Sequence, residues 1–323
     1  MTTNPWDFGI KNELELVERK LRNMVKSEES TLTDASLHVI EAGGKRLRPT
    51  VTILTYRALG GNDIDKIVDI ATGYELIHSA TLVHDDINDG GVSRRGRETV
   101  FKKYGLHDAV VTGDFLFVKA FQLGGVFDKN VIGLTADACA KLAEGEIMQN
   151  RFRHKKNLSV DTYLKIMERK TAYPIKAGAM VGAYLAHASE DVIQSMGNYG
   201  LDLGIAFQII DDVLDFTGDQ KKTGKTGGMD LKDGHLTLPS LLAMKDSPAV
   251  KDAISEVISS QEPSPEDVRK CVELVVKSGA INKSKGMAEY YGIEALGHLG
   301  CMPKNPETEG LRDLVKRVLE RDS

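Results

Sequence analysis

Residues 64–89 read IDKIVDIATGYELIHSATLVHDDIND, a long apolar run that ends in a cluster of aspartates. From residue 64 to residue 84 the apolar side chains recur mostly at intervals of three and four, which is the period of a packed α-helix. Similar patterns run through four further segments, 107–126, 130–152, 171–188 and 189–217. Alternating β-branched residues, which are typical of strands, are scarce. The sequence therefore predicts an all-α protein.

Glycine and proline mark the ends of the expected helices. Pro49 suits the first turn of a helix, and Gly60-Gly61 suits its end. Further breaks are expected at Gly90-Gly91, 218–230 and 261–265. No repeat of fixed period and no long low-complexity linker is present. We therefore expect one domain over residues 1–323, with a motif-bearing core at about 43–240 and a C-terminal helical part at about 250–323.

Composition narrows the functional classes. A chain of 323 residues, 41% hydrophobic and 28% charged, can bury a substantial core. Its formal charge of −5 argues against general nucleic-acid binding, so an anionic substrate must be held by local groups of cations. The N-terminus does not resemble a signal peptide, and no apolar run is long enough for a membrane span. The three cysteines are far apart and suggest neither disulfides nor zinc, so we expect a cytoplasmic protein.

The aspartates at the end of the opening stretch have a spacing that suits a metal site. In a helix Asp85 and Asp89 share one face, while Asp86 is rotated by about 100°. Two carboxylates at close range repel each other unless a hard cation lies between them. Magnesium fits because it takes oxygen ligands and retains water and phosphate. A solvated helix end would give the same pattern, so this motif alone leaves both interpretations open.

A second acidic motif supports the metal interpretation. Residues 207–216 read FQIIDDVLDF, with Asp211, Asp212 and Asp215 inside an apolar run. Acids in apolar surroundings are costly unless they are paired or bound to metal. Two such motifs on separate helices could face each other across a cavity and hold a diphosphate through several magnesium ions.

Two other motif interpretations fail. An EF-hand loop that begins at Asp86 would need an acid or amide at Gly90 and a glutamate at Arg97. A nucleotide-binding P-loop in DQKKTGKT (219–226) would need glycine in place of Asp219, and a strand before it where a helix is predicted.

Basic residues gather near both acidic motifs. The segment GGKRLRP (43–49) places three cations in a glycine-led turn before a helix, an arrangement that can converge on phosphate. Each cation alone could be an ordinary surface residue, but their clustering favours a diphosphate site. The positions are Lys45, Arg46, Arg48, Arg94, Arg95, Lys170 and Lys225.

Seven segments, taken together and in this order, resemble the trans-isoprenyl diphosphate synthases of the polyprenyl synthetase family. They are GGKRLRP, ELIHSATLVHDDIND followed by RRG, VVTGDFLFVKAFQ, KLAEGEIMQ, RKTA, GIAFQIIDDVLDF and GKTGGMDLKDGHLTLP, over about residues 43–240. The resemblance implies the isoprenoid synthase fold, with helices around a central active-site cavity. It also implies a homodimeric prenyltransferase that uses Mg²⁺ to condense isopentenyl diphosphate with an allylic diphosphate.

The resemblance also implies roles for individual residues. Magnesium would be bound by Asp85, Asp89 and Asp211, with Asp86, Asp212 and Asp215 as weaker candidates. The allylic diphosphate would be held by Arg94, Lys170, Thr171, Gln208 and Lys225. Isopentenyl diphosphate would be held by Lys45, Arg48, His78 and Arg95. The catalytic set is expected to be Asp85, Asp89, Asp211, Lys170 and Lys225. His235 stands where many members have lysine, so the role of that position stays open.

Small residues before the first acidic motif bear on product length. Short-chain members of the family typically have a large aromatic at one of the positions that Ala80 and Thr81 occupy here. We therefore expect an all-trans product longer than C20, with the tunnel floor at an aromatic such as Phe117 or Phe121. Helix packing at Ala80, with a geranylgeranyl or farnesyl product, is the alternative.

Two other classes of protein remain as alternatives. A terpene cyclase would usually lack GGKRLRP and would carry a different second metal motif. A non-catalytic subunit of a heteromeric synthase would be expected to have lost acidic or basic site residues, whereas this chain has both acidic motifs.

Overall fold

The structure, a computed structural model, describes residues 8–218 and 227–321. The described residues are almost entirely helical, with one two-stranded sheet, which confirms the predicted all-α class. They form two compact units. Unit 1 is drawn from Met1–Ala136, Ala177–Met196 and Cys301–Leu311, and unit 2 from Asp137–Lys176, Gly197–Gly300 and Arg312–Ser323.

The helices and strands divide between the units as follows. Unit 1 contains α1 (Lys11–Met24), α2 (Ser30–Ile40), α3 (Leu47–Ala58), α4 (Ile64–Asn88), β1 (Ser93–Arg94), β2 (Arg97–Glu98), α5 (Val100–Tyr104) and α6 (Leu106–Gly124). Unit 2 contains α8 (Val160–Met167), η1 (Glu168–Ala172), α12 (Met229–Lys232), α13 (Leu238–Asp246), α14 (Pro248–Ser259), α15 (Pro265–Lys277) and α16 (Ala280–His298). Both units receive residues from α7 (Lys129–Phe152), α9 (Tyr173–Leu185), α10 (Glu190–Thr217), η2 (Leu299–Cys301) and α17 (Pro306–Leu319).

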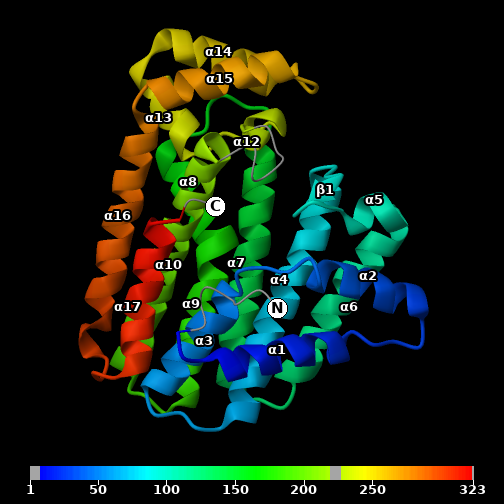
Figure 1. Ribbon diagram of the computed structural model, residues 1–323, viewed down its shortest axis with the longest axis vertical. Coiled ribbons are helices and arrows are strands. Elements are labelled where there is room, and N and C mark those ends of the chain that lie inside the picture. Colours follow the sequence, from blue (N-terminus) through cyan, green and yellow to red (C-terminus); the bar gives the residue numbers. More distant parts are fainter. Residues whose placement is uncertain (1–7, 219–226, 322–323) are drawn as a thin grey trace. The chain divides into compact units, whose positions relative to one another are not determined.

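Unit 1 is built around α4. This helix begins where the Asp63 side chain accepts a hydrogen bond from the backbone N–H of Lys66. It ends at Asn88 and is followed by the C-cap residue Asp89 and a left-handed glycine at position 90. It packs against α1, α3 and α6, and Figure 1 shows α4 and α6 side by side. Most of its length is buried on every side, because these neighbours cover its apolar residues. The last turn, which carries the first acidic motif, is thereby held on a rigid element.

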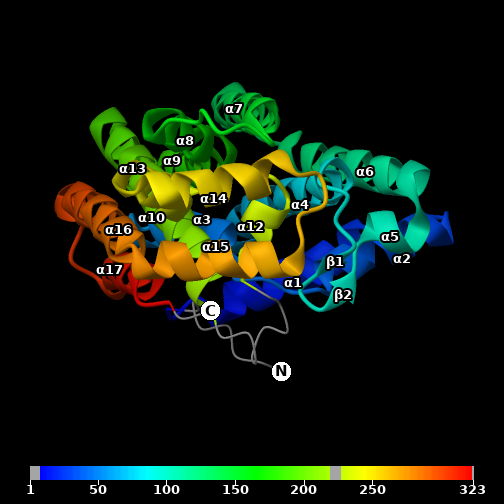
Figure 2. The ribbon, with the colours of Figure 1, turned by 90° about the horizontal axis from the view of Figure 1, so that it is seen from above.

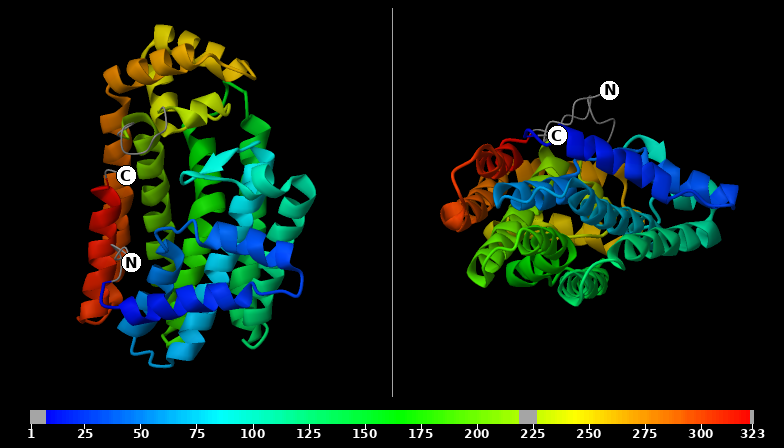
Figure 3. Two further views of the ribbon diagram at one scale, coloured as in Figure 1. Left: turned by 45° about the vertical axis from the view of Figure 1, so that its right-hand side comes forward. Right: turned by 90° about the horizontal axis from the view of Figure 1, so that it is seen from below.

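Unit 2 has its own hydrophobic core. Side chains from α8, α10 and α13–α16 form one buried cluster, which includes Tyr163, Ile209, Leu238 and Ile254. The helices α14 and α15 form a neighbouring pair in Figure 2. The helix α16 lies beside the C-terminal part of α17 in Figure 3, and at Gly292 an added Cβ would come within 2.8 Å of Leu319. The second acidic motif, on α10, thus belongs to a separately packed core.

The helical periods in the sequence predicted the long helices well. The expected segments 64–84, 107–126, 130–152, 171–188 and 189–217 correspond to α4, α6, α7, α9 and α10. Two features were not predicted, namely the β1–β2 hairpin and the π-helical turn η1. No helix in the described ranges is both long and apolar enough to cross a membrane.

Candidate active site

In the first acidic motif the outer aspartates, Asp85 and Asp89, differ in their surroundings from the middle aspartate, Asp86. Asp85 lies in the last turn of α4, and the backbone N–H of Asp89 donates to its carbonyl oxygen over 2.9 Å. Both outer residues are half-buried and four positions apart. Asp86 is buried, and its Oδ1 accepts hydrogen bonds from Nε and Nη2 of Arg94, each over 2.9 Å. The outer carboxylates therefore share a helix face, whereas the middle one is bound by arginine.

The RRG segment folds back as a hairpin. Ser93 pairs with Glu98, and Arg94 pairs with Arg97. The two loop residues, Arg95 and Gly96, have φ values of 52° and 75°, which suits the tight turn between twisted strands. This turn allows Arg94 to reach Asp86. Arg95 lies against the GGKRLRP turn, because a Cβ at Gly44 would be only 3.0 Å from its Nη1.

Cationic side chains surround His78 on α4. Burial is the main cause that holds the pKa of His78 well below its usual range, and Arg48, Arg95, Arg94 and Arg46 lower it further. Burial also lowers the pKa of Arg48, against the opposing effect of Glu75 and Asp85. Unit 1 therefore brings the predicted Arg48, His78, Arg94 and Arg95 within electrostatic range of one another, at the end of α4 that carries the outer aspartates. A neutral imidazole among guanidinium groups is a setting that attracts anions. Lys45 lies in the turn before α3.

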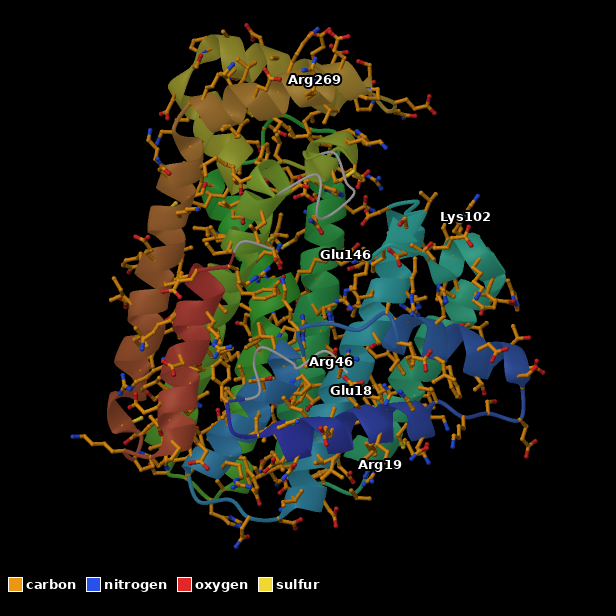
Figure 4. All side chains as sticks on the ribbon, in the orientation of Figure 1. Glu18, Arg19, Arg46, Lys102, Glu146 and Arg269 are labelled. Atoms are coloured by element: carbon orange, nitrogen blue, oxygen red, sulfur yellow. The ribbon has the colours of Figure 1, made fainter. Side chains whose placement is uncertain are left out.

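Arg46 has a structural role within the same GGKRLRP segment. Its Nε donates to Glu18 over 2.5 Å, its Nη1 donates to Glu75 over 2.7 Å, and its Nη2 donates to the carbonyl of Ile40. Figure 4 shows Arg46 and Glu18 pointing toward one another. Burial alone would lower the pKa of Arg46, but Glu75 and Glu18 raise it above its usual value. Only 6% of Arg46 is exposed, so it stabilises the turn from inside.

The second acidic motif also separates its aspartates, within unit 2. Asp211 forms an ion pair with Arg321, whose guanidinium lies 4.5 Å from the ring centre of Phe207. Two further nitrogens of Arg321, Nε and Nη1, are buried without a hydrogen-bond partner in the described part of the chain. Asp215 accepts hydrogen bonds from the backbone N–H groups of residues 229 and 230, each over 3.1 Å, at the start of α12. Asp215 therefore caps a helical turn.

Asp212 points into the core. It is 3% exposed and accepts hydrogen bonds from the Tyr163 hydroxyl over 2.5 Å and from Nε2 of Gln208 over 2.9 Å. Burial raises the pKa of Asp212 to about 7; the bonds from Tyr163 and Gln208 oppose this rise, and Asp211 and Asp215 add to it. The interior position makes Asp212 a poor metal ligand.

The π-helical turn η1 presents two predicted site residues. Lys170 forms an ion pair with Glu146 and donates to Gln149 over 2.7 Å, while the Thr171 hydroxyl donates to Oε1 of Gln208 over 3.0 Å. Glycines allow the close approach of neighbouring helices. A Cβ at Gly145 would lie 2.7 Å from the Lys170 nitrogen, and one at Gly204 would lie 2.6 Å from Cα of residue 172. Such π-turns are frequent at functional sites.

Magnesium suits the carboxylates of these motifs. Within residues 8–218 and 227–321, no three His, Cys, Asp or Glu side chains form a complete metal cage. Magnesium is usually held by one or two carboxylates together with substrate phosphates and water. The hard oxygen donors of Asp85 and Asp89, four positions apart at the end of α4, fit that requirement.

Some predicted residues fall outside this description, and some partners were not foreseen. Lys225 lies outside the described residues. Glu146 and Gln149, the partners of Lys170, were not predicted as site residues, although both lie in the KLAEGEIMQ segment that the sequence analysis identified. Tyr163 and Arg321 had no such signal, because their importance depends on packing against α10.

Unit 1 combines paired carboxylates with a guanidinium cluster, as in proteins that bind metal-complexed diphosphates. Comparison with known proteins agrees, because the family described as Polyprenyl synthetase matches residues 29–275. Heptaprenyl diphosphate synthase component 2 of Geobacillus stearothermophilus is 35% identical over 314 residues, which cover 97% of each chain.

Two solved structures are also similar. The Caulobacter crescentus polyprenyl synthase, complexed with calcium and isoprenyl diphosphate, has a TM-score of 0.94 at 34% identity and covers 98% of this chain and 97% of its own. A Rhodobacter capsulatus decaprenyl diphosphate synthase has a TM-score of 0.90 at 33% identity, with 98% of each chain covered. The chain belongs to the polyprenyl synthetase family. This confirms the predicted family, the isoprenoid synthase fold and the prenyltransferase class.

Proposed function

We propose that this prenyltransferase is magnesium-dependent and that it extends an allylic diphosphate with isopentenyl diphosphate to an all-trans product longer than C20. The observation that carries the proposal is the joint position of the outer aspartates and the guanidinium cluster around His78 at one end of α4. The Caulobacter structure, which contains calcium and an isoprenyl diphosphate, supports a divalent cation and this substrate class.

The proposed roles follow the sequence prediction. Magnesium ligands are Asp85, Asp89 and Asp211. Groups that hold the allylic diphosphate are Arg94, Lys170, Thr171, Gln208 and Lys225. Groups that hold isopentenyl diphosphate are Lys45, Arg48, His78 and Arg95. We further propose that residues 1–323 act as one catalytic domain, as the sequence predicts.

The proposed reaction needs no protein nucleophile. Bound magnesium would neutralise the charge that develops on the departing diphosphate. The fixed arginine and lysine side chains hold that charge in place, so that the allylic C–O bond can break. Apolar helix faces exclude water from the carbocation, and the double bond of isopentenyl diphosphate attacks it to form the new C–C bond. A proton then passes to the departed diphosphate.

The test is a prenyl-transfer assay with magnesium, isopentenyl diphosphate and a farnesyl or geranylgeranyl starter. We expect release of one diphosphate for each added C5 unit and products longer than C20. A folded protein that forms no prenyl diphosphate would contradict the proposal. A cyclic hydrocarbon from the allylic substrate alone would instead indicate a terpene cyclase.

The proposed product length rests on the small residues of α4. Ala80 and Thr81 are buried. A cavity of about 100 Å³ lies beside α4 on the N-terminal side of these residues, with Gly73, Tyr74 and Phe121 in its lining. Tyr74 is eleven positions before Asp85, or about 16 Å along the axis. Phe117 is not in this lining and instead stacks on His84, next to the acidic motif. Phe121 is therefore the better candidate for the floor, and the long-chain relatives support the same length.

Ala80→Phe tests this inference. The aromatic ring should obstruct the tail and shorten the dominant product by at least one C5 unit while activity persists, as measured by chain-length-resolved chromatography. Ala183→Val, at a buried alanine of α9 in the same unit, controls for added volume in the core. A stable, active Ala80→Phe enzyme with products of wild-type length would remove the main support for the long-chain proposal.

We further propose a cytoplasmic homodimer that assembles through α6. Val110, Val111 and Val118 are 40%, 42% and 61% exposed on this helix, and such an apolar face favours a second copy. Sedimentation of the purified chain should give twice its 35.4 kDa mass. A monomer that becomes active only with another chain would point to a heteromeric synthase.

A further inference from the structure

A chain of side-chain hydrogen bonds in unit 2 links the core to two proposed substrate-binding residues. The Tyr163 hydroxyl on α8 donates to Oδ2 of Asp212, and Nε2 of Gln208 donates to Oδ1 of the same carboxylate. Oε1 of Gln208 accepts from the Thr171 hydroxyl on η1. Tyr163, Asp212 and Thr171 are each at most 9% exposed, so water competes little for these bonds.

This chain fixes the direction in which Gln208 points its amide. Nε2 of Gln208 donates to Asp212 and Oε1 of Gln208 accepts from Thr171, so the NH₂ end of the amide faces Asp212 and its carbonyl end faces Thr171. An amide nitrogen carries two hydrogens, and the bond to Asp212 uses one. The second hydrogen of this oriented amide is the one that Gln208 can donate to an anion. The Thr171 hydroxyl has a single hydrogen, which it donates to Gln208, so in this arrangement Thr171 fixes the carbonyl end of the amide.

We propose that Tyr163 and Asp212 are positioning residues, which together with Thr171 orient the amide of Gln208 toward the diphosphate of the allylic substrate. This inference rests on the proposed function. It assigns Asp212 a role that acts through Gln208 and not through a bound metal. The other two aspartates of the motif have different partners, namely Arg321 for Asp211 and the start of α12 for Asp215.

Tyr163→Phe is the sharpest test, because it removes one hydroxyl and retains the ring in the core. Without that bond Asp212 can rotate, and Gln208 loses its fixed partner. We expect the KM for the allylic diphosphate to rise about tenfold while the KM for isopentenyl diphosphate changes less than twofold. Affinity for inorganic pyrophosphate with magnesium, measured by calorimetry, should fall by a similar factor.

A matched control is Tyr199→Phe, which removes the hydroxyl of another fully buried tyrosine in the same unit, about two and a half helical turns before Gln208 on α10. It should leave both KM values unchanged. Asp212→Asn should resemble Tyr163→Phe, because an asparagine cannot accept from both donors with the same geometry.

Three outcomes would overturn the positioning role. One is wild-type kinetics for Tyr163→Phe, another is an equal rise in both KM values, and the third is an effect that tracks only a lower melting temperature. An inactive wild-type enzyme would be a different result, because it would contradict the proposed function itself.

Discussion

The two acidic motifs have the same DDxxD spelling but different surroundings. In the first, on α4, the middle aspartate is bound by the guanidinium of Arg94. In the second, on α10, the middle aspartate is bound by the neutral groups of Tyr163 and Gln208, and burial raises the pKa of Asp212 to about 7. In both motifs the middle carboxylate is held by internal partners. The DDxxD pattern therefore identifies the helix that carries the motif. The packing around each carboxylate determines which aspartate is suited to bind a metal ion.

The largest expected effect separates outer from middle aspartates. Asp85→Asn and Asp211→Asn should each lower kcat by about three orders of magnitude, because each carboxylate would hold a metal ion that stabilises the negative charge on the departing diphosphate. Asp212→Asn should lower kcat/KM by only about tenfold. Steady-state kinetics at saturating magnesium, with circular dichroism as the control for folding, make the comparison. Equal losses for Asp211→Asn and Asp212→Asn would remove the distinction.

Two arginines of the GGKRLRP segment also differ in role, because Arg46 is held by internal glutamates whereas Arg48 is proposed to bind substrate. Arg46→Ala should destabilise the protein by about 3 to 5 kcal/mol, because it leaves Glu18 and Glu75 without their buried cation. Arg48→Ala should cost less stability and should raise the KM for isopentenyl diphosphate. Denaturant unfolding together with kinetics of both variants checks this. If Arg48→Ala were the more destabilising change, the assignment of the two arginines would be reversed.

The neutral surroundings of Asp212 predict a pH effect on stability without magnesium. Its folded pKa of about 7 lies above its usual value, so between about pH 4 and pH 7 the folded state retains a proton that the unfolded state releases. The free energy of unfolding should therefore fall as pH rises through this window, by about 3 kcal/mol from this group. Asp212→Asn should lack that component. Urea titrations at several pH values provide the measurement, and parallel pH profiles for both proteins would contradict it.

The smallest effect concerns the ion pair at the second motif. If Asp211 binds a metal ion as proposed, Arg321 must release it, so Arg321→Gln should lower the magnesium concentration for half-maximal activity by a few fold, roughly 1 kcal/mol. Lys316→Gln is the matched control, since this exposed lysine pairs with Asp313 within α17 and not with an acidic motif. Magnesium titrations of the three proteins decide the point. An increased magnesium requirement in Arg321→Gln would show that Arg321 assists metal binding.

Sequence periodicity predicted the long helices because burial sets their pattern, as the match of 64–84 with α4 shows. It could not predict the hairpin at Arg95, whose strands are two residues long and depend on a left-handed turn. The π-turn at Lys170 likewise depends on close contacts with Gly145 and Gly204 from other helices. Helix geometry separated Asp85 and Asp89 from Asp86, but the partner Tyr163 of Asp212 comes from a distant position, so the aspartates of the second motif were ranked by resemblance alone.

The most direct measurement is Mn²⁺ binding by electron paramagnetic resonance, with inorganic pyrophosphate at a concentration that saturates each protein and with Mn²⁺ as a spectroscopic substitute for Mg²⁺. The proteins to compare are the wild type, Asp85→Asn, Asp86→Asn, Asp211→Asn and Asp212→Asn. We predict that the two outer variants bind Mn²⁺ at least tenfold more weakly than the wild type, whereas the two middle variants stay within about threefold. A loss in Asp86→Asn or Asp212→Asn as large as that in Asp85→Asn and Asp211→Asn would contradict the central claim that the middle aspartates do not bind the metal.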